Sequence, residues 1–220
     1  MSIAQAVDKL ISQSPFLEEA LTDNLINVSS LARKLKPEVE NILKKPVQEG
    51  AVVMAINRRA PGYYFKISKG IKTFMSKLGD IIVRSDLSDH SFENSPTLIV
   101  CQRNLIDEIG TEKNVFCTFS QGIYETTIVT SNSLDSRIEK FFSKEKLLSR
   151  KTGLGSVTIR LPEDNTEISG VYYYILKSLA WGGINIREII STTNEVSIVF
   201  DEKDVHKAFP ILLSLKKPNI

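Results

Sequence analysis

The C-terminal two thirds of the chain alternates between two kinds of hydrophobic pattern. Residues 155–161, 184–190 and 195–200 form the short apolar or alternating runs that are typical of β-strands. Residues 168–181 and 204–214 instead place apolar side chains three to four positions apart, as helices do. The predicted order is strand, helix, strand, strand, helix. One more strand would close such a unit into a ferredoxin-like sandwich, with both helices on one face of an antiparallel sheet.

An earlier part of the chain predicts the same order of elements. Residues 80–84 are expected to form a strand and residues 95–109 a helix. Two strands are then predicted at 114–119 and 125–130, and a helix begins after Ser133, whose hydroxyl suits the N-cap position. The elements predicted at 155–214 repeat this order of strand, helix, strand, strand and helix.

Spacing relates the two predicted units to each other. The segment Glu125-Thr-Thr-Ile-Val-Thr130 aligns with Glu195-Val-Ser-Ile-Val-Phe200, and each leads into a helix. A match of this kind indicates internal duplication. We therefore expect two tandem units, at 79–148 and 149–220.

The first 67 residues predict a separate helical domain. Residues 2–22 have the apolar spacing of a helix. Ser29 or Ser30 is expected to cap a short helix, and Pro37 fits the first turn of another. Two short helices around a tight turn are typical of a helix-turn-helix.

Two apolar runs follow these helices. Residues 50–56 and 63–67 flank a segment that contains Pro61 and Gly62, which predicts a hairpin wing and a winged-helix-like domain over 1–67. Alternatively, residues 46–59 form a further helix, because Ala51, Met54 and Ala55 also suit that state. Residues 68–78 are expected to connect this domain to the next and to contain a short helix.

Composition narrows the classes of function. The chain has 28 basic and 26 acidic residues, so any nucleic-acid binding must be confined to a patch. Cys101 and Cys117 lack a Cys-x-x-Cys spacing and are expected to be free thiols in a reducing compartment. The sequence shows neither a signal-peptide pattern nor an apolar run of about 20 residues, so we expect a cytoplasmic protein that does not enter a membrane.

The sequence shows no apparatus for catalysis. A glycine-rich phosphate loop should follow a strand and open a long helix, whereas Gly153-Leu-Gly155 is predicted to stand before a strand. His90 and His206 are isolated and lack metal-ligand spacing. We therefore expect no catalytic residue, no bound metal and no cofactor.

The loop 162–170 is the best candidate for a binding site. It joins a predicted strand to a helix, where free backbone N–H groups and the positive helix end suit a carboxylate. Gly170 permits close approach of a ligand, and Asn185, at the start of what we expect to be the neighbouring strand, offers a donor and an acceptor. Such a constellation could hold an amino acid, but an ordinary capped loop explains the same residues.

Several of these segments resemble the ACT domain. Residues 169–171 and 183–186 are similar to its pattern of a small residue, glycine and an apolar residue, followed later by Gly-Ile-Asn-Ile. Residues 191–198 resemble the aspartokinase subgroup, in which a Ser/Thr-rich turn precedes glutamate and an apolar strand. The resemblance covers residues 155–214 well and 79–142 weakly, and it does not extend to a kinase domain.

The resemblance implies a regulatory module in which paired ACT units bind lysine, threonine or a similar effector. Some relatives bind the effector amine through an acidic residue near the position of Arg187, next to which this chain has Glu188. An uncharged amino acid, or a purely structural module, therefore stays open. By position, the residues that would line the effector site are Asp164, Asn165, Ile168, Ser169, Gly170, Val171, Asn185 and Ile186.

The N-terminal domain suggests a macromolecular partner. Glu38 and Glu40 would face phosphate unfavourably, which favours a protein partner over DNA. The leading hypothesis is a non-enzymatic, homodimeric amino-acid sensor; the alternatives are a ligand-responsive DNA-binding regulator and a stand-alone regulatory subunit of an aspartokinase-like enzyme. The residues expected to contact the partner or DNA are Asn41, Lys44, Lys45, Gln48, Asn57, Arg58 and Arg59.

Overall fold

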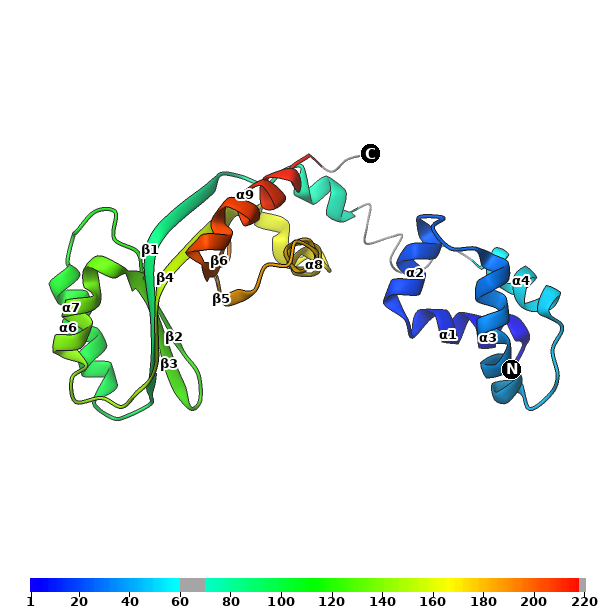
Figure 1. Cartoon of the computed structure of the whole chain (residues 1–220), viewed down its shortest axis with the longest axis horizontal. Helices are drawn as coiled ribbons and strands as arrows, with labels where there is room; N and C mark the ends of the chain where they lie inside the picture. The colour runs from blue at the N-terminus through cyan, green and yellow to red at the C-terminus, as the bar shows by residue number, and fades with distance from the viewer. Residues whose placement is uncertain (60–69, 218–220) are drawn as a thin grey trace. The chain divides into compact units, whose positions relative to one another are not determined.

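The chain divides into two compact units (Figure 1). The computed structural model describes residues 1–59 and 70–217. The first unit is Met1–Thr73 together with Ile168–Gly170, and the second is Phe74–Glu167 together with Val171–Ile220.

The first unit is helical over its described residues. The Ser2 hydroxyl accepts a hydrogen bond from the Gln5 backbone N–H at 3.2 Å, and the Gln5 side chain accepts one from the Ser2 N–H, so the first helix starts with a capping box. Its apolar side meets a common core that includes Ile11, Leu35 and Val52. The helices are α1 (Ile3–Ser12), α2 (Pro15–Thr22), α3 (Val28–Leu43) and α4 (Glu49–Asn57).

The predicted break at Pro37 is wrong, because α3 continues through this residue. Proline removes one helical hydrogen bond, yet Leu31, Leu35 and Val39 on the two sides of it are all buried. Burying this stripe outweighs the lost bond. The predicted cap is also wrong, since Asn27 caps the helix by accepting a bond from the Ser30 N–H at 3.0 Å.

The predicted wing is wrong in its first strand. Residues 50–56 belong to helix α4, as the alternative interpretation of 46–59 expected. Val52 and Ile56 lie one helical turn apart and are both buried in the core. The predicted second strand, 63–67, lies outside the described residues.

The second unit contains one antiparallel sheet, in the order β2-β3-β1-β4-β6-β5 over the described residues. Residues 70–75 form a helix before it. The strands are β1 (Ile81–Glu93), β2 (Cys117–Gln121), β3 (Glu125–Ser131), β4 (Leu147–Arg160), β5 (Ile186–Ser191) and β6 (Glu195–Asp201). The helices are α6 (Leu98–Ile109), α7 (Asp135–Phe141), α8 (Val171–Trp181) and α9 (Val205–Ser214).

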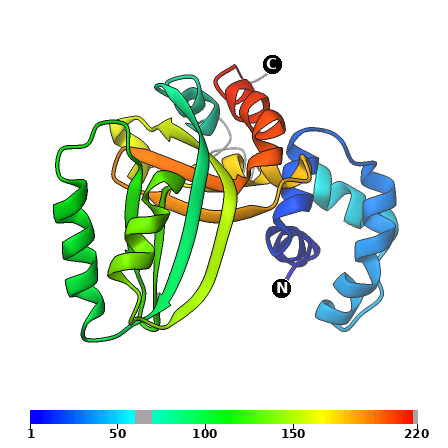
Figure 2. The same cartoon turned by 60° about the vertical axis from the view of Figure 1, so that its left-hand side comes forward.

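Strands β1 and β4 are longer than the predicted segments 80–84 and 155–161, and they run side by side through the whole unit (Figure 2). Gly153-Leu-Gly155 lies inside β4 rather than before a strand. Positive φ angles occur midway, at Asp86 (53°) and Gly153 (66°), where the pairing of β1 with β4 also shifts register. These bends divide the sheet into two halves.

We define the first half as β2, β3 and the parts of β1 and β4 that lie near them, residues 87–93 and 147–152. The second half contains β5, β6 and the other parts of the long strands, residues 81–84 and 154–160. Helices α6 and α7 cover the first half, and α8 and α9 cover the second (Figure 1). In each half, therefore, one face of the sheet carries two helices.

Each half of the sheet packs closely against its second helix. In the first half, Phe92 of β1 stacks on Phe142, which follows α7, with ring centroids 4.9 Å apart. In the second half, α9 approaches β4 so closely that a Cβ on Gly155 would lie 2.5 Å from a methyl carbon of Val205. In each half, a 3₁₀ turn precedes the second helix, α7 or α9. Ser133 lies inside the first of these turns, so the predicted cap at Ser133 is wrong: α7 begins at Asp135 without a side-chain cap.

Candidate functional site

The loop between β4 and α8 is fixed by one buried side chain. Asn165 lies in a 3₁₀ turn, Glu163–Thr166, and is 7% exposed. Its Nδ2 donates to the carbonyl of Pro162 at 3.0 Å and to the carbonyl of Thr193 at 2.6 Å. The Leu161 N–H also donates to the Asn194 carbonyl at 2.7 Å. The loop is thus bonded to the turn that joins β5 and β6.

The first half of the sheet has an equivalent junction, which the sequence analysis missed. Asn94 follows β1, and its Nδ2 donates to the Gly122 carbonyl at 2.9 Å in the turn between β2 and β3. Its Oδ1 accepts a bond from the Thr126 hydroxyl at 2.7 Å. The sequence signal for this junction is that an asparagine follows the first strand of each unit: Asn94 follows β1, and Asn165 follows β4.

The remaining loop residues differ in exposure. Asp164 is half-buried, whereas Ser169 is exposed. Gly170 has a φ of +88°, which glycine adopts without strain, and Val171 begins α8 as a buried residue. The division of the chain into compact units separates Ile168–Gly170 from the rest of this loop.

The structure does not bring Asn185 to this loop. Strand β6 lies between β5 and β4, so β5 is not the neighbour of β4. Ile186 pairs with Phe200 near the end of β6, whereas the turn that contacts the loop lies at its beginning. Helix α8 carries the chain back along the sheet before β5 starts, which places Asn185 and Ile186 at the opposite end. The expectation that β5 is the neighbour of β4 is therefore wrong, and within one chain the loop and Asn185 lie at opposite ends of the sheet.

Arg187 and Glu188 have different surroundings. Arg187 makes two hydrogen bonds to the Asp201 carboxylate, at 2.8 and 3.0 Å, which lower the pKa of Asp201. Burial raises the pKa of Glu188, and the nearby Asp89 carboxylate raises it further. Arg187 is therefore held by a neighbouring strand, whereas Glu188 is in an acidic, partly buried environment.

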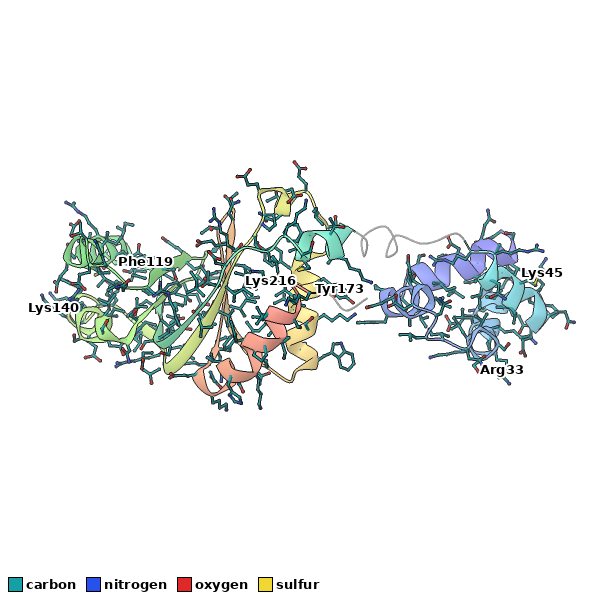
Figure 3. The ribbon with its side chains drawn as sticks, turned by 90° about the horizontal axis from the view of Figure 1, so that it is seen from above. Arg33, Lys45, Phe119, Lys140, Tyr173 and Lys216 are labelled. Atoms are coloured by element: carbon teal, nitrogen blue, oxygen red, sulfur yellow. The ribbon has the colours of Figure 1, made fainter. Side chains whose placement is uncertain are left out.

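The predicted partner-binding residues of the first unit fall into three places. Four of them are exposed near the α3–α4 connection, and Lys44 Nζ donates to Asn41 Oδ1 at 2.9 Å (Figure 3 labels the nearby Lys45). Asn57 and Arg58 are exposed at the end of α4. Arg59 instead has a side chain only 14% exposed and forms ion pairs with Asp8 at 2.7 Å and Glu18 at 3.6 Å. The exposed residues at the α3–α4 connection are Asn41, Lys44, Lys45 and Gln48.

Titratable side chains elsewhere are engaged in structural contacts. His90 is 2% exposed, and its Nε2 lies 3.1 Å from Oδ1 of Asp135. The other carboxylate oxygen, Oδ2, accepts bonds from Ser88 and Arg150. Within residues 1–59 and 70–217, no group of three or more histidine, cysteine or acidic side chains is placed to hold a metal ion.

Both cysteines are free thiols and are half-buried. No described helix has the length and apolar content for crossing a membrane.

These features define a mixed α+β fold in which helices pack on an antiparallel sheet, an arrangement consistent with ACT-like ferredoxin folds. Among solved structures, the regulatory subunit of aspartate kinase from Thermus thermophilus matches with a TM-score of 0.51 and 11% identity, over 63% of this chain and 97% of that one. Aspartokinase alpha and beta subunits match with a TM-score of 0.51 and 16% identity, over 64% of this chain and 99% of that one.

A complete kinase also matches. Aspartate kinase from Clostridium acetobutylicum has a TM-score of 0.53 and 14% identity, over 64% of this chain, which spans only 35% of that enzyme. No protein-family model matches the sequence. No curated protein matches it either. At these identities the likeness establishes the fold, and activity and ligands are matters for proposal.

Proposed function

We propose that the chain is a non-catalytic regulatory protein that senses an amino acid through two ACT-type units. The observation that carries this proposal is the bonded loop–turn junction of the second half, in a fold shared with an aspartate kinase regulatory subunit. The buried amide of Asn165 fixes the loop before any ligand arrives, which lowers the entropic cost of binding.

The pairing of the long strands supports the tandem arrangement. The first half has the order strand, helix, strand, strand, helix, and residues 147–152 of β4 close it beside β1. The second half repeats this order from residue 154 onward, and residues 81–84 of β1 supply its closing strand. Each proposed unit is therefore completed by a strand that the other unit continues.

We place the effector at the β4–α8 loop, with Asp164, Asn165 and residues 168–171 as its lining. Free N–H groups at the start of α8 suit the effector carboxylate. Asn185 and Ile186 lie at the far end of the sheet in the same chain, so they would contribute only from a second copy. A homodimer would make that possible.

Thermal unfolding in the presence of each of the twenty amino acids tests this proposal. A ligand that binds only the folded chain at 100 times its Kd stabilises it by about 2.7 kcal/mol, which should raise the Tm by several degrees. One amino acid, or a few related ones, should produce this shift. A flat response across the panel would contradict sensing and leave a purely structural module.

Charge reversal locates the site. Ser169→Asp puts a carboxylate on an exposed loop position, where it should repel the effector carboxylate and raise the Kd about tenfold or more. Ser133→Asp makes the same change at an exposed position in the first half and serves as the control. Equal affinity of both variants would place the ligand elsewhere.

One observation favours a second candidate, the stand-alone regulatory subunit of an aspartokinase-like enzyme. The match covers 97% of a chain that is itself a separate regulatory subunit. In that case the first unit would bind a protein partner, and a co-expressed kinase chain should co-purify with the full chain. The chain alone should show no phosphate transfer from ATP to aspartate in a coupled assay; measurable turnover would overturn the non-catalytic proposal.

The DNA-binding alternative gains no support from the first unit, because Arg59 is engaged with Asp8 and Glu18. Fluorescence anisotropy with duplex DNA at low salt should show no binding. Salt-dependent binding that Lys44→Ala and Lys45→Ala weaken would restore this alternative.

A further inference from the structure

The carboxylate of Glu145 is bound by the loop that begins α6. Glu145 lies between α7 and β4, in the first half of the sheet. The Ser95 hydroxyl donates to its Oε2 at 2.5 Å, and the Thr97 hydroxyl donates to its Oε1 at 2.6 Å. The Cys101 thiol lies 3.5 Å from Oε1 and donates to the same oxygen. Each carboxylate oxygen therefore has a hydroxyl donor.

The donors are arranged for an anion. The Ser95 oxygen accepts a bond from the Leu98 N–H at 3.1 Å, which leaves its own proton free for Glu145. The Ser95 and Thr97 hydroxyl oxygens also lie 3.1 Å apart. Hydrogen bonds from hydroxyls to a charged oxygen are short and strong. The distances from Ser95 and Thr97 to Glu145 are short in this way. Bonds from Ser95 and then Thr97 lower the pKa of Glu145, which keeps the carboxyl ionised. We call Ser95, Thr97 and Cys101 the carboxylate seat.

The seat lies at the junction that corresponds to the proposed effector loop. Asn94, immediately before Ser95, bonds to the turn between β2 and β3, as Asn165 bonds to the turn between β5 and β6. Of the residues after α9, the structure describes 215–217, and none of these three is acidic: Lys216 donates through Nζ to the Gly79 carbonyl at 2.5 Å. The two junctions therefore differ in the side chain that comes from the segment after the second helix: Glu145 after α7 and Lys216 after α9.

A cavity of about 220 Å³ adjoins the bound carboxylate. Glu145 lines it together with Phe92, Phe142 and Arg150. The cavity is large enough for a small organic acid. Ser95, Thr97 and Cys101 do not line it, so an added acid would reach them only through the space that the Glu145 side chain fills.

We propose that the carboxylate seat is a binding site for a carboxylate, and that this chain fills it with its own Glu145. The built-in ligand closes the first half to free carboxylates, so only the junction of the second half is open to an effector. This inference rests on the proposed function only where it treats the two junctions as equivalent; the seat itself stands on its hydrogen bonds.

Rescue by a small carboxylate tests the proposal in the full chain. Glu145→Ala should lower the Tm, because the seat then has donors and no acceptor. Sodium formate, compared with sodium chloride at equal ionic strength, should raise the Tm of this variant by about 2–4 °C. Wild type should show no such rise, since its seat is filled.

Glu112→Ala is the matched control, because Glu112 pairs with Arg137 at 2.7 Å and touches no hydroxyl seat. Formate should not rescue it. A formate effect that is equal in wild type, Glu112→Ala and Glu145→Ala, or absent from all three, would overturn the proposal. No effector is needed for this experiment, so its failure leaves amino-acid sensing untouched.

A measurement on the wild type covers the case in which Glu145→Ala does not fold. The Glu145 carboxyl should titrate below ordinary glutamates when it is followed by carbon-13 NMR. Ser95→Ala should raise its pKa, because the largest stabilising bond is removed. A normal pKa in wild type, or one that Ser95→Ala does not raise, would mean that the seat does not bind the carboxylate.

Discussion

Arg59 shows how two ion pairs change the interpretation of a basic cluster in the sequence. Its neighbour Arg58 is exposed, whereas Arg59 reaches back across the first unit to Asp8 and Glu18. We predict that Arg59→Ala lowers the free energy of unfolding by about 1–3 kcal/mol, because it removes one ion pair with Asp8 and one with the buried Glu18. Urea unfolding measures this change.

Arg58→Ala is the control for that measurement and should stay within about 0.5 kcal/mol of wild type, as exposed substitutions usually do. If both variants were equally stable, the ion pairs of Arg59 would contribute nothing. Any loss of partner or DNA binding in a double Arg58/Arg59 variant must therefore be separated from loss of stability.

Asp89 predicts a pH dependence of stability. Its Oδ1 is buried and has no hydrogen-bond partner among the described residues, and burial raises the pKa of its carboxyl. A folded state with a raised pKa holds the proton more tightly, so this stabilisation is present below the unfolded-state pKa and is lost as pH rises through the folded-state value. Asp89→Asn has no carboxyl group to ionise at this position, so the variant should not lose stability in this way as pH rises.

Urea unfolding of wild type and Asp89→Asn over the range from pH 4 to 7 tests the prediction. The variant should gain stability relative to wild type as pH rises, and the difference should level off once the wild-type carboxyl is ionised. A difference that does not change with pH would show that Asp89 is not protonated more easily in the folded chain.

At the scale of elements, the packing of α9 on β4 depends on Gly155. A Cβ there would lie 2.5 Å from a Val205 methyl carbon and 3.1 Å from the Arg84 carbonyl oxygen. We predict that Gly155→Ala lowers the free energy of unfolding by about 1–3 kcal/mol, because the helix or the neighbouring strand must shift.

Gly50→Ala is the matched control, since nothing lies within 4 Å of the added Cβ and the residue is in helix α4. It should stabilise the chain by about 0.5–1 kcal/mol, through the helix preference of alanine. Chemical denaturation of both variants gives the comparison; equal stability would mean that α9 can move away from β4 at no cost.

At the scale of the whole molecule, we predict a homodimer. Strands β2 and β5 each have one described neighbour and form the edges of the sheet. Ile123 and Tyr124, at the β2–β3 turn, are 87% and 83% exposed. Unpaired edges and exposed apolar side chains are commonly covered by a second copy.

Size-exclusion chromatography with light scattering should give twice the chain mass of 24.7 kDa. Ile123→Lys with Tyr124→Lys should shift the mass toward the monomer if the β2 edge forms the contact. An unchanged dimer would assign the contact to the β5 edge or to another surface, whereas a monomeric wild type would contradict the prediction and remove any role for Asn185 from a second copy.

The sequence by itself determined the type and order of most elements in the second unit. Hydrophobic periodicity is a local property, so the alternation at 195–200 and the helical spacing at 204–214 predicted β6 and α9 directly. The local pattern failed at 50–56, where an apolar run fits a strand or a helix equally well. There, the neighbouring helices α1 and α3 provided a core for a helical face.

Only the tertiary structure decided what lies beside what. Long-range partners determine the length of β1 and β4, the distance of Asn185 from the β4–α8 loop, and the ion pairs of Arg59. Glu145 and Ser95 are 50 residues apart, and no spacing rule joins them. Local propensity acts over a few residues, whereas each of these contacts forms only when its own unit has folded, so the site depends on the tertiary structure.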